Sequence, residues 1–333
     1  MVTFSLCMIV KNEEKILARC LDSLKGLMDE IIIVDTGSTD HTIEIARTYT
    51  DHIYTYSWEN DFSKARNFAF SKATMDYIYS ADADELLDME NQKRFQALKK
   101  ALLPEIEIVQ MYYCNQFQYN TTYNYDKEYR PKLFKRQRSF HWIEPIHETI
   151  ALDPVVYDSD ICITHLPESN HAPRDLRRFV QLFEEHVRLS THLHNMYARE
   201  LFIAGTPSDF TDAIPVFEDS MMDTDRTADE IREATCVLVR AYHLGNHIHG
   251  FFTNALKNIA GDGTSEVCYE LGLYYSERKE WQEAAIWYEN AAYETECVLN
   301  LCIKEHYALE GLADCYDALG NPSEAILIRS KLS

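Results

Sequence analysis

The chain has 333 residues, of which 54 are acidic and 32 basic, giving a formal net charge of −22. This balance argues against a nucleic-acid backbone or an anionic membrane as the main partner, because both attract a basic protein surface. With 46% hydrophobic and 12% aromatic residues, the chain can bury substantial cores, and its length indicates about two domains. We find no integral membrane segment, and the nine cysteines show no paired CxxC spacing. We therefore expect a protein of the reducing cytoplasm whose thiols are mostly buried.

The first 80 residues alternate between segments typical of strands and of helices. Apolar or β-branched runs predict strands at 4–10, 30–34, 51–56 and 77–80. Apolar residues at helical spacing predict helices over 16–24, 42–46 and 62–73. This alternation predicts an α/β fold with a parallel sheet, in which a ligand site lies beyond the carboxyl ends of the strands.

Three polar clusters follow these strands, at 11–14, 35–40 and 82–85. The third holds three carboxylates in four positions: Asp82, Asp84 and Glu85. Such acids repel one another, and a divalent cation, which carboxylates bind and which itself holds phosphate, explains their crowding. The alternative is an acidic turn that caps a helix beginning near Leu86. The loop at 35–40 matches neither a P-loop nor a GxGxxG motif, so we predict a nucleotide site completed by a carboxylate-bound metal.

Four motifs in order resemble those of a known family. They are MIVKNEE at 8–14, IIIVDTGSTDHT at 31–42, DFSKARNFA at 61–69 and ADADE at 81–85, and they resemble the inverting, GT-A fold glycosyltransferases of family 2. The resemblance implies a GT-A catalytic domain at residues 1–166, with a mostly parallel sheet flanked by helices. It implies a hexosyltransferase that uses a UDP-sugar with Mg²⁺ or Mn²⁺ held by Asp82 and Asp84. The matching positions implicated in binding the nucleotide sugar are Ile9, Val10, Lys11, Glu13, Asp35, Arg66, Asp82, Ala83 and Asp84.

The roles of three of these residues have alternative interpretations. Asp35 could simply cap its own loop, and Arg66 could be a solvated charge on a helix. Lys11 stands where the family more commonly has an aromatic residue, so the base would pack against its alkyl stem. The metal has a clear chemical role, because it stabilises the charge on the departing nucleoside diphosphate.

Further candidates lie between residues 129 and 148. The basic strand at 129–136 either faces the donor phosphates or balances charge. The pair His147-Glu148 resembles a His-Glu pair near the end of the catalytic domain of related transferases. We therefore predict that His147 is a metal ligand and that Glu148 is the base, apart from the metal-binding acids, that takes the proton of the acceptor. Asp88 and Glu85 are rival bases, and the alternative for the pair is a hydrogen-bonded strand end.

Beyond His165 the sequence becomes helical, so we expect an all-α domain at residues 167–333. Small and aromatic residues follow the spacing of a tetratricopeptide (TPR) repeat at Leu271, Gly272, Tyr275, Ala284, Tyr288 and Ala291. A weaker copy includes Ala313, Tyr316 and Ala325. Degenerate copies at 201–217 and 239–255 would give three or four helical hairpins, whereas the alternative is a generic helical bundle.

The domain order resembles that of the glycocin (sublancin-type) peptide S-glycosyltransferases. This resemblance implies a homodimer that transfers sugar from a UDP-sugar to a cysteine or serine side chain of a peptide or protein. One alternative is a saccharide-extending transferase of lipopolysaccharide-core or capsule synthesis. Another is a non-catalytic TPR scaffold with a relic transferase domain, which the retained acids and the His147-Glu148 pair disfavour.

Overall fold

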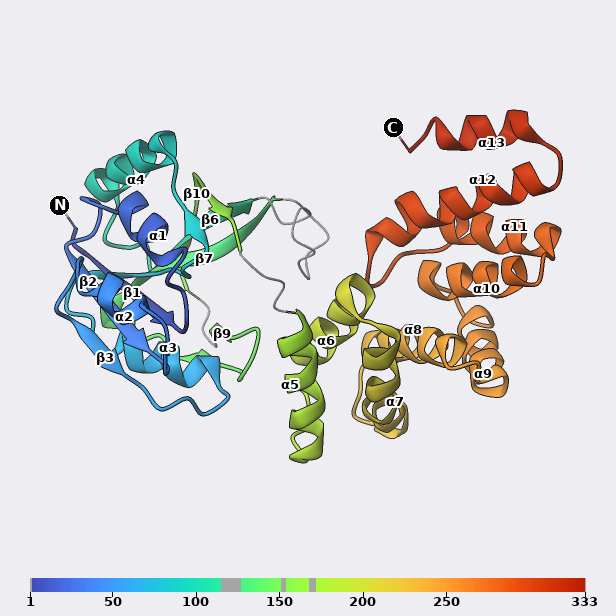
Figure 1. The fold of residues 1–333 in the computed structure, drawn as a ribbon, viewed down its shortest axis with the longest axis horizontal. Helices are drawn as coiled ribbons and strands as arrows, with labels where there is room; N and C mark the ends of the chain where they lie inside the picture. Colours follow the sequence, from blue (N-terminus) through green and yellow to red (C-terminus); the bar gives the residue numbers. More distant parts are fainter. Residues whose placement is uncertain (1, 115–126, 151–153, 168–171, 333) are drawn as a thin grey trace. The chain divides into compact units, whose positions relative to one another are not determined.

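The computed structural model of the chain describes residues 2–114, 127–150, 154–167 and 172–332. These residues form two compact units, Met1–Asn170 and His171–Ser333. The first unit is a mixed α/β domain, and the second is all-helical over its described residues (Figure 1). None of the helices in these ranges is both long and apolar enough to cross a lipid bilayer.

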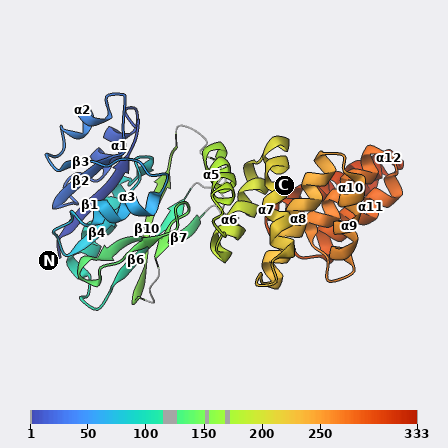
Figure 2. The same cartoon turned by 90° about the horizontal axis from the view of Figure 1, so that it is seen from below.

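A mixed eight-stranded sheet forms the centre of the first unit (Figure 2). The strands lie side by side in the order β3-β2-β1-β4-β7-β6-β10-β5. Their bounds are β1 (Phe4–Val10), β2 (Glu30–Asp35), β3 (Ile53–Thr55), β4 (Tyr77–Ser80), β5 (Glu85–Leu86), β6 (Ile108–Cys114), β7 (Lys127–Lys135) and β10 (Val156–His165). Strands β1 to β4 pair in parallel, and β7 runs antiparallel to both β4 and β6. The mostly parallel α/β sheet that the sequence predicts is confirmed.

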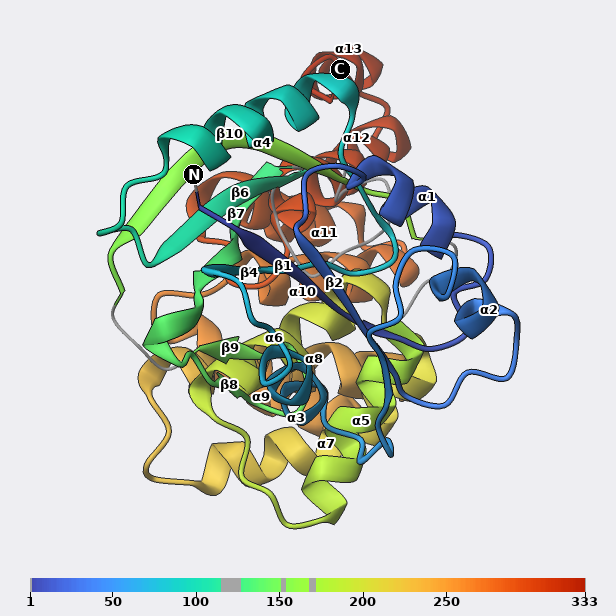
Figure 3. The same ribbon diagram turned by 90° about the vertical axis from the view of Figure 1, so that its left-hand side faces the viewer.

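Helices and a small ribbon cover the two faces of this sheet (Figure 3). Helices α1 (Leu17–Ser23), α2 (Thr42–Ala46) and α4 (Met89–Ala101) cover one face, where they pack on alternate residues of β1. Helix α3 (Phe62–Phe70) and the ribbon of β8 (Trp142–Ile143) and β9 (Thr149–Ile150) cover the other face. A short 3-10 helix, η2 (Arg136–Arg138), follows β7. Because strand side chains alternate between faces, β1 is buried on both sides, which explains its continuous apolar run.

The structure differs from the sequence prediction after the acidic cluster. Glu85 and Leu86 form β5, which pairs antiparallel with β10, so no helix begins near Leu86. Helix α4 begins at Met89, and its N-cap is Asp88, whose Oδ1 accepts a hydrogen bond from the backbone N–H of Asn91 at 2.8 Å. The acids at 82–85 therefore do not cap a helix, and that alternative is wrong.

Two of the nine cysteines also differ from expectation. Cys114 on β6 and Cys162 on β10 form a disulfide, although we expected free thiols. The parallel pairing of β6 with β10 brings together two residues 48 positions apart in the sequence, which local spacing could not indicate. The other seven cysteines are free, and five of them are buried, as expected: Cys7, Cys20, Cys236, Cys268 and Cys315.

The second unit is built from successive helices whose order in space follows the chain (Figure 2). Their bounds are α5 (Ala172–Glu184), α6 (Thr191–Ala204), α7 (Pro207–Met222), α8 (Ala228–Leu244), α9 (Ile248–Ile259), α10 (Ser265–Glu277), α11 (Trp281–Glu289), α12 (Ala308–Ala318) and α13 (Pro322–Arg329). Two π-helical segments, η3 (Asn290–Glu294) and η4 (Ile303–Tyr307), follow α11 and precede α12. Helix α8 packs on α9, which agrees with the helical hairpin expected at 239–255. Helix α7 packs mainly on α8, and not on α6, so the hairpin expected at 201–217 is not found.

One tyrosine ring explains the glycine of the repeat-like pattern and a second glycine on the next helix. A Cβ atom added to Gly272 on α10 would lie 2.6 Å from the ring of Tyr288 on α11, and one added to Gly311 on α12 would lie 2.6 Å from the same ring. Three consecutive helices therefore pack closely only because glycine faces Tyr288 from both neighbouring helices. Tyr288 is itself 3% exposed, and it lies in one apolar core with residues of α10 to α13.

Candidate active site

The three polar clusters lie at one edge of the sheet. Val10, the last residue of β1, is in register with Asp35, the last residue of β2. On the other side of β1, Cys7 is in register with Ser80, the last residue of β4, and the acidic cluster follows directly. Parallel pairing therefore places these strand ends together, where the α/β topology predicts a ligand site.

The first two loops are joined by hydrogen bonds. Asn12, whose φ is 58°, donates from its backbone N–H to Ser38 Oγ at 3.0 Å, and its Oδ1 accepts from the N–H of Thr39 at 2.8 Å. One turn further on, Glu14 Oε2 lies 2.9 Å from His41 Nδ1 and accepts from the N–H of His41 at 3.0 Å. The two loops thus form one polar surface beyond β1 and β2.

Asp35 is buried, with 4% of its surface exposed, and it stabilises its own loop. Its carboxylate accepts hydrogen bonds from the backbone N–H groups of Gly37 and Ser38, both at 3.1 Å. Gly37 has a φ of 106°, a conformation that side chains other than glycine rarely adopt. The loop-capping reading of Asp35 is therefore confirmed, and a contact with a nucleotide stays a prediction.

The remaining candidates of the first loop differ in exposure. Ile9 is half-buried, Val10 is buried and Lys11 is exposed. The backbone N–H of Glu13 donates to Thr42 Oγ1 at 2.7 Å, which ties the first loop to the start of α2. Lys11 is thus the candidate of this loop whose side chain is open to solvent.

Each carboxylate of the acidic cluster has its own basic partner. Asp82 Oδ1 accepts from Arg66 Nη2 at 2.8 Å, and Asp84 Oδ2 lies 3.1 Å from His165 Nε2. Glu85 forms an ion pair with Lys132 that is almost fully buried, since the two side chains are 3% and 8% exposed. Protein side chains therefore already offset much of the repulsion in this cluster, and the crowding of acids alone does not require a metal.

Burial and neighbouring charge act differently on two of these acids. Burial alone would raise the pKa of Asp82, but the opposing charges of Arg66 and Lys132 are stronger and hold its pKa well below the ordinary value. Burial raises the pKa of Glu85 to about 7, and the nearby charge of Asp82 adds to this rise against the attraction of Lys132. Asp82 is thus held as a carboxylate at the surface of the site, while Glu85 is directed into the core.

Arg66 connects this cluster with the second predicted site. From α3, its Nη1 donates to Ser80 Oγ at 3.1 Å, its Nη2 to Asp82, and its Nε to Glu148 Oε1. The side chain of Arg66 is only 12% exposed, so the reading of it as a solvated helix charge is wrong. Glu148, which we expected to stand apart from the metal-binding acids, is linked to Asp82 through this guanidinium.

The connection between β8 and β9 carries His147 and Glu148. His147 has a φ of 47°, in the left-handed region, and the carbonyl of Pro145 accepts from the N–H of Phe62 at 3.0 Å, which ties this connection to the start of α3. Glu148 is the member of the pair that reaches Arg66. The assignment of His147 as a metal ligand stays a prediction.

The acids at 82 and 84 fit a hard divalent cation. Asp84 Oδ1 is buried and accepts no hydrogen bond from any residue that the structure describes. A buried carboxylate oxygen without a partner costs free energy, and a cation would supply that partner. The side chain of Asp82 is 38% exposed, so it can take a ligand, whereas Ala83 between them is buried and offers only its backbone.

Two residues that the sequence analysis did not assign to the site contact these acids. His165 ends β10 and reaches Asp84 because β10 pairs with β5, with His165 in register with Glu85. Lys132 belongs to the basic strand, but it neither lies on the surface nor faces the open site, because it pairs with Glu85. The sequence separations from Asp84 to His165 and from Glu85 to Lys132 explain why neither contact was visible before the sheet was known.

Comparison with known proteins adds an independent finding. Residues 5–151 match the sequence model described as Glycosyl transferase family 2. A TPR repeat-containing protein of Synechococcus elongatus is 48% identical over 90 residues, which are 27% of this chain and 22% of that protein. The SPbeta prophage-derived glycosyltransferase SunS of Bacillus subtilis (strain 168) is 32% identical over 196 residues, which are 56% of this chain and 46% of SunS. The chain thus spans less than half the length of these two curated relatives.

Comparison with solved structures gives a weaker similarity. Glucosyl-3-phosphoglycerate synthase from Mycobacterium tuberculosis, in complex with Mg²⁺ and uridine diphosphate, has a TM-score of 0.40 and 13% sequence identity, and the similarity covers 57% of this chain and 81% of the synthase. The matched segment 5–151 contains all four sequence motifs and the linked side chains of Arg66, Asp82 and Glu148. This part of the chain is therefore similar to glycosyl transferase family 2.

Proposed function

We propose that the chain is a metal-dependent, inverting glycosyltransferase that transfers a sugar from a UDP-sugar to a cysteine or serine side chain of a peptide or protein. The observation that carries the proposal is the buried Asp84 Oδ1, which lacks a hydrogen-bond donor among the described residues and lies beside the partly exposed Asp82 in the family-2 segment. Such a pair of acids suits a divalent cation that carries a nucleoside diphosphate.

The roles of the residues follow from their positions. Asp82 and Asp84 would hold Mg²⁺ or Mn²⁺, which when bound stabilises the charge on the departing diphosphate. The joined loops at 11–14 and 35–42, with Asp35 bracing the second, would receive the uridine part of the donor. Arg66 would keep Asp82 and Glu148 in place and offer its positive charge to the diphosphate.

Glu148 is the candidate base. Glu148 is bound by Arg66, which also binds Asp82. The two other candidate bases already have other contacts, because Glu85 is buried against Lys132 and Asp88 caps α4. An inverting transfer needs the acceptor to attack from the face opposite the diphosphate, and a carboxylate there removes the acceptor's proton as the bond forms.

A peptide acceptor is supported by the resemblance to peptide S-glycosyltransferases, by the similarity to SunS over 196 residues and by the helical second unit. Helical-repeat units commonly bind extended peptide segments on their surfaces.

The test is to incubate the full chain with a panel of UDP-sugars, Mn²⁺ and a mixture of cysteine- and serine-containing peptides. We expect mass spectrometry to show hexose additions on peptides, absent when a chelator removes the metal. Hydrolysis of the donor without modified peptide would favour a saccharide-extending transferase, and addition of oligosaccharide acceptors to the same assay would check this. No binding of any UDP-sugar would contradict the proposal and favour a scaffold.

A further inference from the structure

The segment between β4 and β5 carries both acids assigned to the metal, and Lys132 on β7 contacts its two ends. Lys132 Nζ donates to the carbonyl of Ser80, the last residue of β4, at 3.3 Å. It also donates to Oε1 of Glu85, the first residue of β5. We propose that Lys132 is a positioning residue, which holds Glu85 away from the cation and leaves the other two acids to bind it. This inference rests on the proposed function and adds a residue to it.

The sheet explains how a lysine comes to lie inside the domain at this point. Strand β7 lies between β4 and β6, and Leu133 is in register with Tyr79 of β4. Because the two strands are antiparallel, Lys132 comes level with Ser80, where β4 ends. The Lys132 side chain is 8% exposed, and lysines are rarely buried to this extent unless they are paired.

The position of this buried pair is more informative than its energy. Desolvation cancels much of the attraction in a buried ion pair, so stability alone does not account for it. Glu85 directly follows Asp84 and is the third acid of the cluster, and the carboxylates of aspartate and glutamate both suit Mg²⁺ or Mn²⁺. Without its partner, Glu85 would be an uncompensated charge one residue from Asp84 and would compete for the cation. Lys132 thus determines which two of the three acids are available.

Lys132 also acts on the partly exposed acid of the site. Ser80 accepts from Lys132 through its carbonyl and from Arg66 Nη1 through its Oγ, the latter at 3.1 Å. Arg66 in turn binds Asp82. Burial alone would raise the pKa of Asp82, and the charge of Lys132 adds to that of Arg66 in lowering it. Loss of Lys132 would therefore change both the position of Glu85 and the charge around Asp82.

The test measures the binding of UDP to the full chain by isothermal calorimetry over a series of Mn²⁺ concentrations. We expect Lys132→Met to raise the Mn²⁺ concentration for half-maximal UDP binding by at least about tenfold, as is common when a group that orients metal ligands is lost. We expect the double variant Lys132→Met, Glu85→Gln to return to within about threefold of the parent, because no buried carboxylate is left without a partner. Glu85→Gln alone should also stay within about threefold, since its amide oxygen still accepts from Lys132.

The matched control is Lys99→Met on α4. Lys99 bridges a carbonyl and a carboxylate as Lys132 does, because its Nζ donates to the carbonyl of Leu27 at 2.8 Å and to Asp29 Oδ2 at 2.5 Å. Its side chain is 12% exposed. Asp29 also accepts from the backbone N–H of Phe4, the first residue of β1, so this pair lies at the end of the sheet opposite the ligand edge. The variant should lose stability without a change in the Mn²⁺ dependence.

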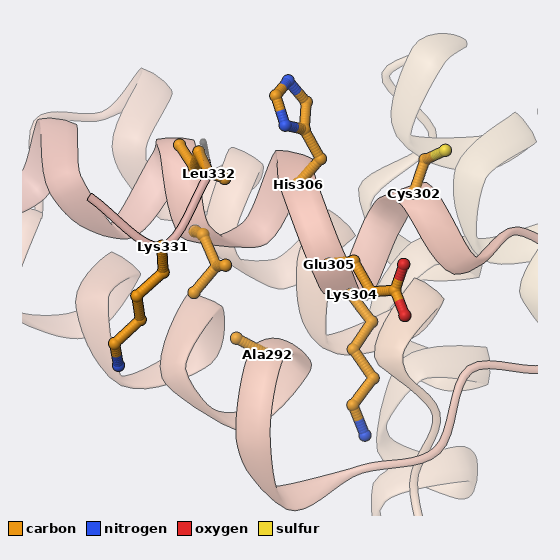
Figure 4. A pocket seen from close by; sticks show the side chains of 8 residues that line it. Ala292, Cys302, Lys304, Glu305, His306, Lys331 and Leu332 are labelled. Carbon is orange, nitrogen blue, oxygen red and sulfur yellow. The ribbon is translucent and has the colours of Figure 1, made fainter. Parts of the chain in front are cut away.

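A second control removes a lysine charge from the second unit. Lys304 on η4 lines a pocket of about 550 Å³ in that unit (Figure 4), and its Nζ donates to the carbonyl of Thr295 at 2.6 Å. Loss of any lysine makes this acidic chain more attractive to Mn²⁺. Lys304→Met measures that general effect, which we expect to be below about twofold at physiological ionic strength.

Circular dichroism checks that each variant is folded. The proposal is overturned if folded Lys132→Met keeps the Mn²⁺ dependence of the parent, if Lys99→Met loses as much, or if the double variant recovers nothing. A loss of about tenfold in Glu85→Gln would make Glu85 a metal ligand and would also overturn the proposal, so this variant decides the question should Lys132→Met not fold. Absence of Mn²⁺-dependent UDP binding by the parent itself would overturn the proposed function, and this inference with it.

Discussion

Arg66 Nη2 donates to Asp82 Oδ1 at 2.8 Å, and the Nε of the same guanidinium donates to Glu148. One cation thus serves both the acid assigned to the metal and the acid assigned to proton transfer. A planar group with donors at fixed angles can do this, whereas an ammonium cannot reach the same acceptors together.

We therefore expect Arg66→Lys to lower the free energy of unfolding by about 1–3 kcal/mol, because the largely buried carboxylate of Glu148 and the partly exposed carboxylate of Asp82 lose part of their partner. Urea denaturation followed by circular dichroism measures this. The control is Arg94→Lys on α4, whose ion pair with Glu90 is largely exposed and should be worth less than about 0.5 kcal/mol. If both variants lost the same free energy of unfolding, the contacts of Arg66 would stabilise the fold no more than an exposed ion pair does.

The metal assignment is tested by Asp84→Asn. The amide keeps the size of the side chain but removes the charge that a divalent cation needs, so we expect Mn²⁺-dependent binding of UDP-sugar to weaken at least about tenfold. Isothermal calorimetry with and without Mn²⁺ gives the result. Asp51→Asn, in an exposed position before β3, is the matched control. Unchanged metal-dependent affinity in a folded Asp84→Asn protein would exclude Asp84 as a ligand.

The base assignment is tested by Glu148→Gln. We expect donor affinity to stay within about threefold, which is less than ~1 kcal/mol, while turnover with a serine acceptor falls by about 10²-fold or more. The loss should be smaller with a cysteine acceptor, because a thiol is already partly ionised near neutral pH.

The comparison variant for the base is Asp88→Asn. Since Asp88 caps α4, this change should affect stability slightly and turnover little. The opposite pattern, with turnover kept in Glu148→Gln and lost in Asp88→Asn, would transfer the role of base to Asp88.

The packing of the second unit predicts the effect of Gly272→Ala. The added methyl group would meet the Tyr288 ring at 2.6 Å, so we expect a loss of about 1–3 kcal/mol in the free energy of unfolding. Gly261→Ala is the control, because its Cβ would lie 3.5 Å from the nearest atom, an ordinary contact. A second change, Tyr288→Leu, should recover part of the loss in the double variant, and full additivity of the two changes would contradict a direct clash.

The capping box of α8 predicts a dependence of stability on pH. Burial opposes ionisation of Glu230, but hydrogen bonds from Thr227 and the charge of Arg226 prevail and lower its pKa to about 2. Because the pKa in the folded protein is below the ordinary value of 4.5, the ionised group stabilises the fold above about pH 5, and this stabilisation is lost as the pH falls toward 2. We expect the difference in unfolding free energy between the parent and Glu230→Gln to be ~2–3 kcal/mol at pH 7 and roughly half of that at pH 3. A difference that did not change with pH would contradict the assignment.

The strands and the location of the site could be predicted because they depend on local patterns. Apolar runs such as 4–10 and 30–34 identify buried strands, and polar residues at their ends identify the ligand edge. The four motifs then lie where parallel pairing brings them together. The segment after β4 was harder to predict, since the two residues of β5 and the two-residue connection to α4 are too short to show a period.

The partners of the acids could not be predicted from the sequence. His165 reaches Asp84, and Lys132 reaches Glu85, only through the positions of β10 and β7 in the sheet. Arg66 was recognised as a candidate from its motif, but its link to Glu148 spans 82 positions. Likewise, the two π-helical segments depend on packing among α10 to α12 and leave no clear periodic signal.

The joined loops beyond β1 and β2 have a consequence for the thermodynamics of binding. Asn12 is hydrogen-bonded to Ser38 and Thr39, and Glu14 to His41, before any ligand arrives. The entropy of ordering this surface is therefore lost when the chain folds and not when a nucleotide binds. A ligand that binds to such an ordered surface therefore binds with a smaller loss of entropy. A substitution that removes the Asn12 side chain should make the entropy of nucleotide binding less favourable.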